Sequence, residues 1–74
     1  MGMMALMRTV PIRDDAIRLG QFLKLADLVL DGAEVKPLVS SGEVLVNGEA
    51  EVRRGRQLAK GDVVTVRGER ARVG

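Results

Sequence analysis

The spacing of the apolar residues changes once along the chain, near Gly42, and this change limits the folds that are open to it. Before Gly42 the apolar residues recur at steps of three and four, as on one face of a helix. After it they alternate with other residues, as in a strand with one buried face. The sequence therefore predicts helices first and strands afterwards, an α+β fold in which two helices pack on a small antiparallel sheet.

Two helices are expected before Gly42. The first has an apolar face within residues 19–30, and Gly32 lies where such a helix commonly ends. The expected members of this face are Leu19, Phe22, Leu23, Ala26, Val29 and Leu30. A second, shorter helix should begin near Glu34, with Asp31 or a neighbour as its cap and an apolar face within residues 35–39.

Strands and tight turns are expected in the second part. Asn47-Gly48 between apolar segments is the strongest short-range hairpin signal, because both turn positions require a positive φ. It should join a strand at Val44–Val46 to a return strand at Glu49–Val52. A β-branched strand at Val63–Val66 should lie between a turn at 60–62 and a turn at Gly68.

Shorter segments are expected near the two ends of the sequence. Thr9–Arg13 can form an edge strand, because Pro11 cannot donate to a central ladder. Asp14-Asp15 should turn the chain after it, and Ala71–Val73 can pair as the last strand. Residues 1–8 are expected to form a flexible N-terminus and residues 9–74 a single domain.

The composition excludes several kinds of functional site. The chain has no cysteine and no histidine, so a disulfide, a thiolate metal site and a serine–histidine pair cannot be built. A chain of 74 residues cannot form both a core and a deep active-site cavity. No apolar run reaches the roughly 20 residues of a membrane span, and the start lacks the features of a secretory signal. We therefore expect a cytoplasmic protein that is not an enzyme and has no cofactor, metal, small-molecule substrate or membrane partner.

The charge is distributed unevenly along the chain. Residues 1–52 carry five basic and eight acidic side chains, a net charge of −3, whereas residues 53–74 carry seven basic and two acidic ones, a net charge of +5. Uneven charge of this kind indicates an anionic partner.

The densest part of the basic segment is Arg53-Arg54-Gly55-Arg56, followed by Lys60. Guanidinium groups form planar, bidentate contacts with phosphate oxygens. The alternative is a solvated loop that keeps the protein soluble. We expect binding to an anion instead, because we expect no acidic neighbour to neutralise the run and because a connection within a sheet can hold the charges in place.

Phe22 is the only aromatic residue, and it lies on the apolar face of the first expected helix. A large apolar residue at helical spacing usually faces the core, so no ring remains to stack on an unpaired base. Proteins that bind single-stranded RNA depend on such stacking. An RNA partner should therefore be structured, and it should be recognised by shape and charge.

From Arg18 onward the chain resembles the S4 domain, the RNA-binding domain named for small-subunit ribosomal protein S4. The matching stretches are Arg18–Lys24, Gly32–Val39, Ser41–Gly48 and Lys60–Val64. The chain is similar in particular to a small bacterial subfamily in which this domain stands alone. That subfamily has Gly-Gln-Phe-Leu-Lys in the first helix and Arg-Arg-Gly-Arg after the hairpin.

The resemblance implies a helix–turn–helix pair on a small sheet, with RNA bound by the two helices and nearby basic residues. The implied partner is structured RNA, ribosomal or transfer RNA, with a ribosome or protein partner possible beside it. Carried over by position, the resemblance implicates Arg18, Lys24 and Lys36 in RNA binding. The basic run Arg53, Arg54 and Arg56 matches that of the subfamily, and Lys60 flanks it. The chain departs from the family where the second helix opens. Asp31 and Gly32 stand where the family has a serine and an arginine, which shifts the expected contacts toward Lys36 and the arginine run.

Two alternatives remain at this stage. Val44–Val66 also shares a Val-Asn-Gly hairpin and a later Gly-Asp turn with sulfur carriers of the β-grasp type. Those carriers act through a flexible Gly-Gly terminus, whereas this sequence finishes Arg72-Val73-Gly74, and two expected helices precede the hairpin. The other alternative is a protein-interaction module whose basic loop meets an acidic partner.

Overall fold

The structure is a computed structural model that describes residues 7–74. Its elements in chain order are β1 (Arg8–Val10), β2 (Ala16–Arg18), α1 (Leu19–Leu25), the 3-10 helix η1 (Gly32–Glu34), α2 (Val35–Ser40), β3 (Val44–Val46), β4 (Glu49–Ala50), β5 (Gln57–Ala59), β6 (Val63–Val66) and β7 (Glu69–Val73). The flexible terminus expected for residues 1–8 falls largely outside the described residues. Within residues 7–74, no helix has the length and apolar character needed to cross a membrane.

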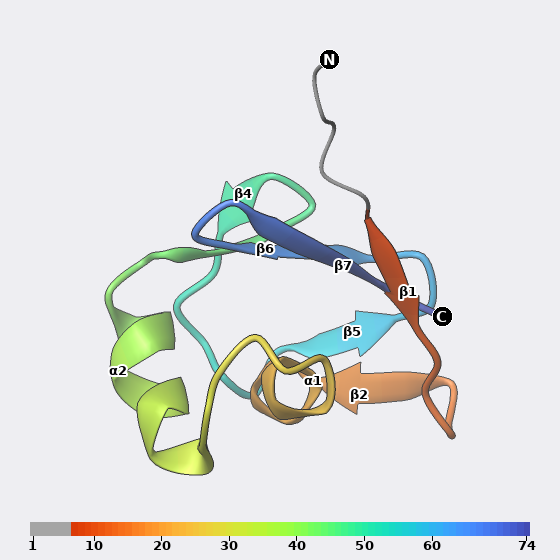
Figure 1. Ribbon diagram of the computed structural model, residues 1–74, viewed down its shortest axis with the longest axis horizontal. Helices are drawn as coiled ribbons and strands as arrows, with labels where there is room; N and C mark the ends of the chain where they lie inside the picture. Colours follow the sequence, from red (N-terminus) through yellow and green to blue (C-terminus); the bar gives the residue numbers. More distant parts are fainter. Residues whose placement is uncertain (1–6) are drawn as a thin grey trace.

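Five strands form one sheet in the order β1-β7-β6-β3-β4, and β2 and β5 form a separate antiparallel pair. Both α1 and α2 lie on the same side of the five-stranded sheet (Figure 1). The expected α+β class, with two helices packed on a sheet, is confirmed. One pairing differs from the expected antiparallel pattern: β1 runs parallel to β7, with Arg8 opposite Ala71. Strand β1 is at the edge of the sheet, as Pro11 indicated.

The first helix is shorter than its apolar pattern indicated. Helix α1 ends at Leu25 because Asp27 adopts a left-handed conformation, with a φ of 58°. The N–H of Leu28 then donates to the carbonyl of Leu23 at 2.9 Å, a bond that closes helix C-termini in the Schellman motif. Leu30, which was expected on the apolar face, is instead 92% exposed.

The second helix begins as expected. The Asp31 carboxylate accepts a hydrogen bond from the N–H of Ala33 at 2.9 Å, and η1 leads directly into α2. The apolar face expected for α2 is buried, with Val35, Leu38 and Val39 pointing into the core.

The core lies between the helices and the five-stranded sheet. Phe22 is fully buried, as its position in the helical pattern indicated. The other large side chains with less than 2% exposure are Leu19, Leu23, Leu58, Val39, Val44, Val46, Val64 and Val73. Strand β2 was not expected. It pairs with β5 so that Ile17 lies opposite Leu58, and it leads directly into α1.

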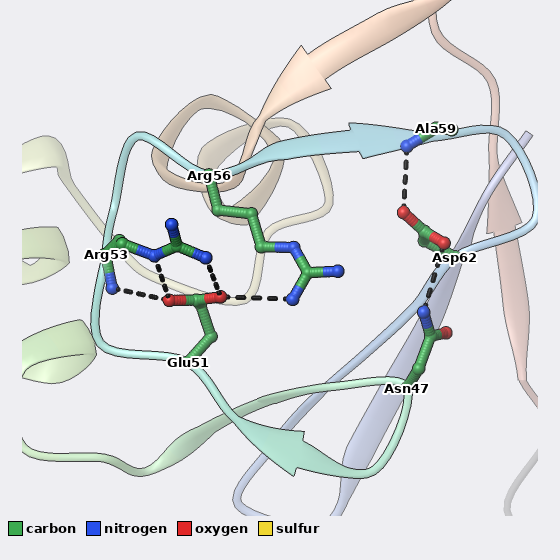
Figure 2. A network of polar contacts seen from close by, with 6 residues as sticks. All are labelled: Asn47, Glu51, Arg53, Arg56, Ala59 and Asp62. Atoms are coloured by element: carbon green, nitrogen blue, oxygen red, sulfur yellow. Dashed lines mark hydrogen bonds and ion pairs between the residues drawn. The ribbon is translucent and has the colours of Figure 1, made fainter.

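The expected hairpin is present, although its return strand β4 ends at Ala50 instead of Val52. Asn47 and Gly48 have φ values of 53° and 87°. The Asn47 amide also joins this turn to the next one. It donates to Asp62 at 3.1 Å (Figure 2), and it accepts from the N–H of Val63 at 2.9 Å. Asp62 in turn accepts from the N–H of Ala59 at 2.9 Å.

Two substitutions of Asn47 should separate the contributions of its backbone conformation and of its side-chain hydrogen bonds to stability. We expect Asn47→Ala to lower the free energy of unfolding by roughly 2 kcal/mol, because alanine is strained at positive φ and forms neither hydrogen bond. Asn47→Gly tolerates the φ but also lacks the hydrogen bonds, so it should cost about 1 kcal/mol. Urea-induced unfolding of the two variants and the unchanged protein measures both values. Equal losses in the two variants would show that the backbone conformation contributes nothing.

Candidate RNA-binding surface

The segment 53–56, here called the arginine loop, is attached to the start of α1 by its backbone. The N–H of Leu19 donates to the carbonyl of Arg56 at 2.8 Å, and the N–H of Gly20 donates to the carbonyl of Arg54 at 2.9 Å. A Cβ at Gly20 would lie 3.2 Å from Val35 Cγ1 and 3.5 Å from the Arg54 oxygen, so a glycine allows this close approach. The loop therefore has a fixed position against the two helices.

Glu51 neutralises part of this loop. Its side chain is 7% exposed and accepts four hydrogen bonds (Figure 2). Three come from Arg53, from the backbone N–H and Nε at 3.0 Å and from Nη2 at 3.2 Å, and one comes from Arg56 Nη1 at 3.1 Å. The expectation that the arginine run has no acidic neighbour is therefore wrong. Glu51 stands two residues before the run, but only the turn of the chain after β4 brings its carboxylate into contact with both guanidinium groups.

The Glu51 network changes the roles of the three arginines. Hydrogen bonds from the Arg53 side chain and backbone, and a further one from Arg56, lower the pKa of Glu51 from 4.5 to about 2. The same contact raises the pKa of Arg53. Arg54 differs from both, since it makes no ion pair and no side-chain hydrogen bond with any residue in the range 7–74. Glu51 therefore does not neutralise the charge of Arg54.

Arg54 forms part of a shallow concavity of about 340 Å³, here called the basic hollow. It is lined by Arg18, Gly20, Gln21, Lys24, Gly32, Val35, Arg54 and Gly55. Its three cations come from the end of β2, from α1 and from the arginine loop, and no carboxylate lines it. Gly32, a departure from the family pattern, lies beside Lys24: a Cβ there would be 3.6 Å from Lys24 Cδ and 3.7 Å from Nζ, which is ordinary van der Waals contact.

A second concavity, of about 700 Å³, lies on the other side of Lys24, between α1 and the segment 11–17. Gln21 and Lys24 line both concavities, so the two are neighbours on either side of these α1 side chains. Arg13 adds a fourth cation on this side, beside the acidic Asp14. The sequence analysis did not select Arg13; its position two residues after Pro11, ahead of two aspartates, gave no sign that it would face α1.

The structure brings together three of the seven basic residues predicted from the sequence, namely Arg18, Lys24 and Arg54. Lys36 is exposed on α2 next to Val35 but does not line the basic hollow. Lys60 lies in the turn after β5, at the opposite end of that strand from the arginine loop. Arg53 and Arg56 form ion pairs with Glu51 and do not line the basic hollow.

Comparison with known proteins identifies the family. The family described as the S4 domain matches residues 10–74. The chain belongs to the S4 domain family. This is the family of RNA-binding domains that the motifs in Arg18–Val64 indicated.

Two known proteins show how far the similarity extends. The chain is 51% identical over 59 residues to the probable ribosome maturation protein RlbA of Bacillus subtilis (strain 168), a match that covers 80% of this chain and 83% of that protein. It also superposes on the crystal structure of 30S ribosomal protein S4e from Thermoplasma acidophilum with a TM-score of 0.62 and 23% identity. That match covers 81% of this chain and 32% of S4e, and it establishes the fold alone.

The family match includes Val44–Val66, so the Val-Asn-Gly hairpin and the Gly-Asp turn that resemble those of sulfur carriers are part of an S4 domain. Gly74 also differs from the flexible terminus that sulfur carriers use. Its N–H donates to Val10 at 2.9 Å and its carbonyl accepts from Ile12 at 3.2 Å.

The Glu51 network predicts a pH dependence of stability. Because the pKa of Glu51 is about 2 in the folded protein and 4.5 in the absence of its partners, its contribution is complete above pH 4.5 and is lost as the pH falls toward 2. We expect Glu51→Gln to be less stable than the unchanged protein at neutral pH and to lose less stability between pH 4.5 and pH 2.

Urea unfolding across this range measures the difference. Glu43→Gln is the matched control: its ion pair with Arg67 is more exposed, so its effect should be smaller. Parallel pH curves for the Glu51→Gln variant and the unchanged protein would contradict the network.

Proposed function

We propose that this protein binds structured RNA, of the ribosomal or transfer type, through phosphate contacts along the basic hollow, and that it does not alter the RNA chemically. The observation that carries the proposal is the convergence of Arg18, Lys24 and Arg54 on one concavity that no carboxylate lines. Three cations from separate segments at one place form a site for a chain of phosphates, whose negative charge dominates the affinity of RNA-binding proteins.

The surface favours recognition by shape. Phe22, the single aromatic residue of the chain, is fully buried, so base stacking has no platform. The guanidinium of Arg54 can form the bidentate contact with phosphate that an ammonium group cannot. Gln21, between the two concavities, offers an amide to a ribose hydroxyl or a base edge. Such a surface fits the backbone of a folded RNA better than an extended single strand.

The similarity to a probable ribosome maturation protein supports ribosomal RNA as the partner and the cytoplasm as the location. Arg53 and Arg56 would add one net positive charge beside the site, because they share the single carboxylate of Glu51. Lys36 and Lys60 remain predicted contacts outside the hollow.

The Glu51 network determines which substitutions test this proposal. Removing the side chains of Arg53, Arg54 and Arg56 together would leave the buried Glu51 carboxylate without a guanidinium, with only the backbone N–H of residue 53 as donor, and a buried charge without its ion-pair partner is strongly destabilising. Loss of RNA binding in such a variant would not distinguish a lost contact from a lost fold. Lys24 and Arg54 are exposed and make no ion pair within residues 7–74, so their replacement should leave the fold intact.

The double variant Lys24→Gln, Arg54→Gln should bind a structured ribosomal RNA fragment at least about tenfold more weakly than the unchanged protein, because each lost phosphate contact releases one counterion fewer. The slope of log K against log salt concentration should become smaller by about two. Fluorescence anisotropy at several salt concentrations measures both values, and an unstructured RNA of equal length should bind more weakly throughout.

The single variant Arg54→Gln has a control of equal charge in Arg67→Gln. Arg67 lies outside the basic hollow and is not a predicted RNA contact, and circular dichroism can establish that all of these variants are folded. Retained binding in the control and weaker binding in the Arg54→Gln variant is the expected result. Equal losses in these two single variants would show that the hollow has no special role.

A further inference from the structure

The basic hollow accounts for only part of the positive charge in residues 53–74. Arg53 and Arg56 share Glu51, and Arg67 pairs with Glu43 at 3.0 Å. Arg54 belongs to the hollow. The remaining cations of this segment are Lys60, Arg70 and Arg72. Arg70 and Arg72 both lie on β7, so this strand carries a second group of positive charges, separate from the basic hollow.

Arg70 and Arg72 lie on the face of the sheet that points away from the helices. Strand β7 alternates, with Ala71 and Val73 buried in the core and the two arginines exposed. Side chains two residues apart on a strand share a face. Both helices cover the opposite side (Figure 1), and within residues 7–74 no element covers the face that carries the arginines.

The strand register shows what surrounds the two arginines. Arg70 lies opposite Thr65, and Arg72 lies between Val63 and Thr9. The two residues are thus separated by two strand positions, about 7 Å along β7. Neither makes an ion pair within residues 7–74, and their partners across the strands are threonine and valine instead of aspartate or glutamate. The threonine hydroxyls add hydrogen-bond donors to the same face.

We propose that Arg70 and Arg72, with Thr9 and Thr65, form a second phosphate-binding surface, and that the domain binds between two RNA segments and bridges them. This inference rests on the proposed function of the basic hollow. The hollow lies on the helical side of the sheet and the arginines on the other, so one RNA helix seated in the hollow does not reach both. A second segment of the folded RNA, or a second RNA molecule, occupies the outer face.

The chemistry of the outer face favours RNA over a protein partner. Protein interfaces depend on large apolar or aromatic anchors in the middle of the contact. The apolar side chains of this face, Val63 and Leu45, are partly buried between strands, and the exposed Leu25 and Leu30 stand on the helical side. Exposed guanidinium groups among hydroxyls instead suit a row of phosphates.

The stoichiometry of binding to a short RNA hairpin tests the proposal. Native mass spectrometry or sedimentation with excess hairpin should find two hairpins per unchanged protein. The variant Arg70→Gln, Arg72→Gln should bind one. The Lys24→Gln, Arg54→Gln variant loses the same charge from the other side of the sheet and should also bind one. ¹⁵N NMR should show the Arg70 and Arg72 Nε signals shifting only with the second equivalent of hairpin.

The outcomes separate this inference from the proposed function. One hairpin per unchanged protein at saturation overturns the second surface. So does an unchanged stoichiometry in the Arg70, Arg72 variant when thermal unfolding shows it to be folded. Two hairpins on the Lys24, Arg54 variant would instead overturn the role of the hollow. Movement of the β7 signals with a polyglutamate peptide but not with RNA would assign the face to an acidic protein and overturn its RNA role.

Discussion

The Glu51 carboxylate holds the arginine loop in the conformation on which the start of α1 depends. Three guanidinium groups within four residues repel one another, and one almost buried carboxylate offsets that repulsion by binding two of them. The carbonyls of Arg54 and Arg56 then face the first N–H groups of α1, which have no acceptor within the helix. The loop, the helix and β5 therefore form one connected unit, although the sequence separates α1 from the loop by more than a whole helix and hairpin.

The three arginines of this short basic run therefore make different contacts. Arg53 and Arg56 bind Glu51, and Arg54 between them makes no ion pair within residues 7–74. In the proposed function, Arg54 would contact a phosphate from a backbone that is already fixed, so binding would order its side chain but not the loop. Arg18 at the end of β2 and Lys24 in α1 likewise have backbones that are fixed in regular elements. A solvated loop with the same composition would present as much charge but would have to be ordered on binding.

Local signals were enough to predict much of the fold. Asn47-Gly48, the β-branched run Val63–Val66 and the buried Phe22 each depend on near neighbours, and all three are confirmed. The end of α1 at Leu25 was missed because the apolar pattern continues past Asp27, whose positive φ stops the helix. Pairings between distant segments, β2 with β5 and β1 with β7, left no periodic trace in strands of three residues. For the site, the charge pattern indicated Arg54 and the family resemblance indicated Arg18 and Lys24, whereas the bonds of Glu51 to the loop and the position of Arg13 beside α1 arise only in three dimensions.

The parallel pairing of β1 with β7 also constrains the order in which the molecule can assemble. Arg8 meets Ala71, a separation of 71 − 8 = 63 residues in a chain of 74. Closing a loop of this length loses conformational entropy before the contact is gained, which favours formation of this pairing after the local contacts. The helices, the hairpin and β6 can pack before β7 arrives, whereas β1 has no strand partner until then. The edge of the sheet nearest the N-terminus is thus completed by the last strand in the sequence, so this small domain closes only when nearly all of its chain is present.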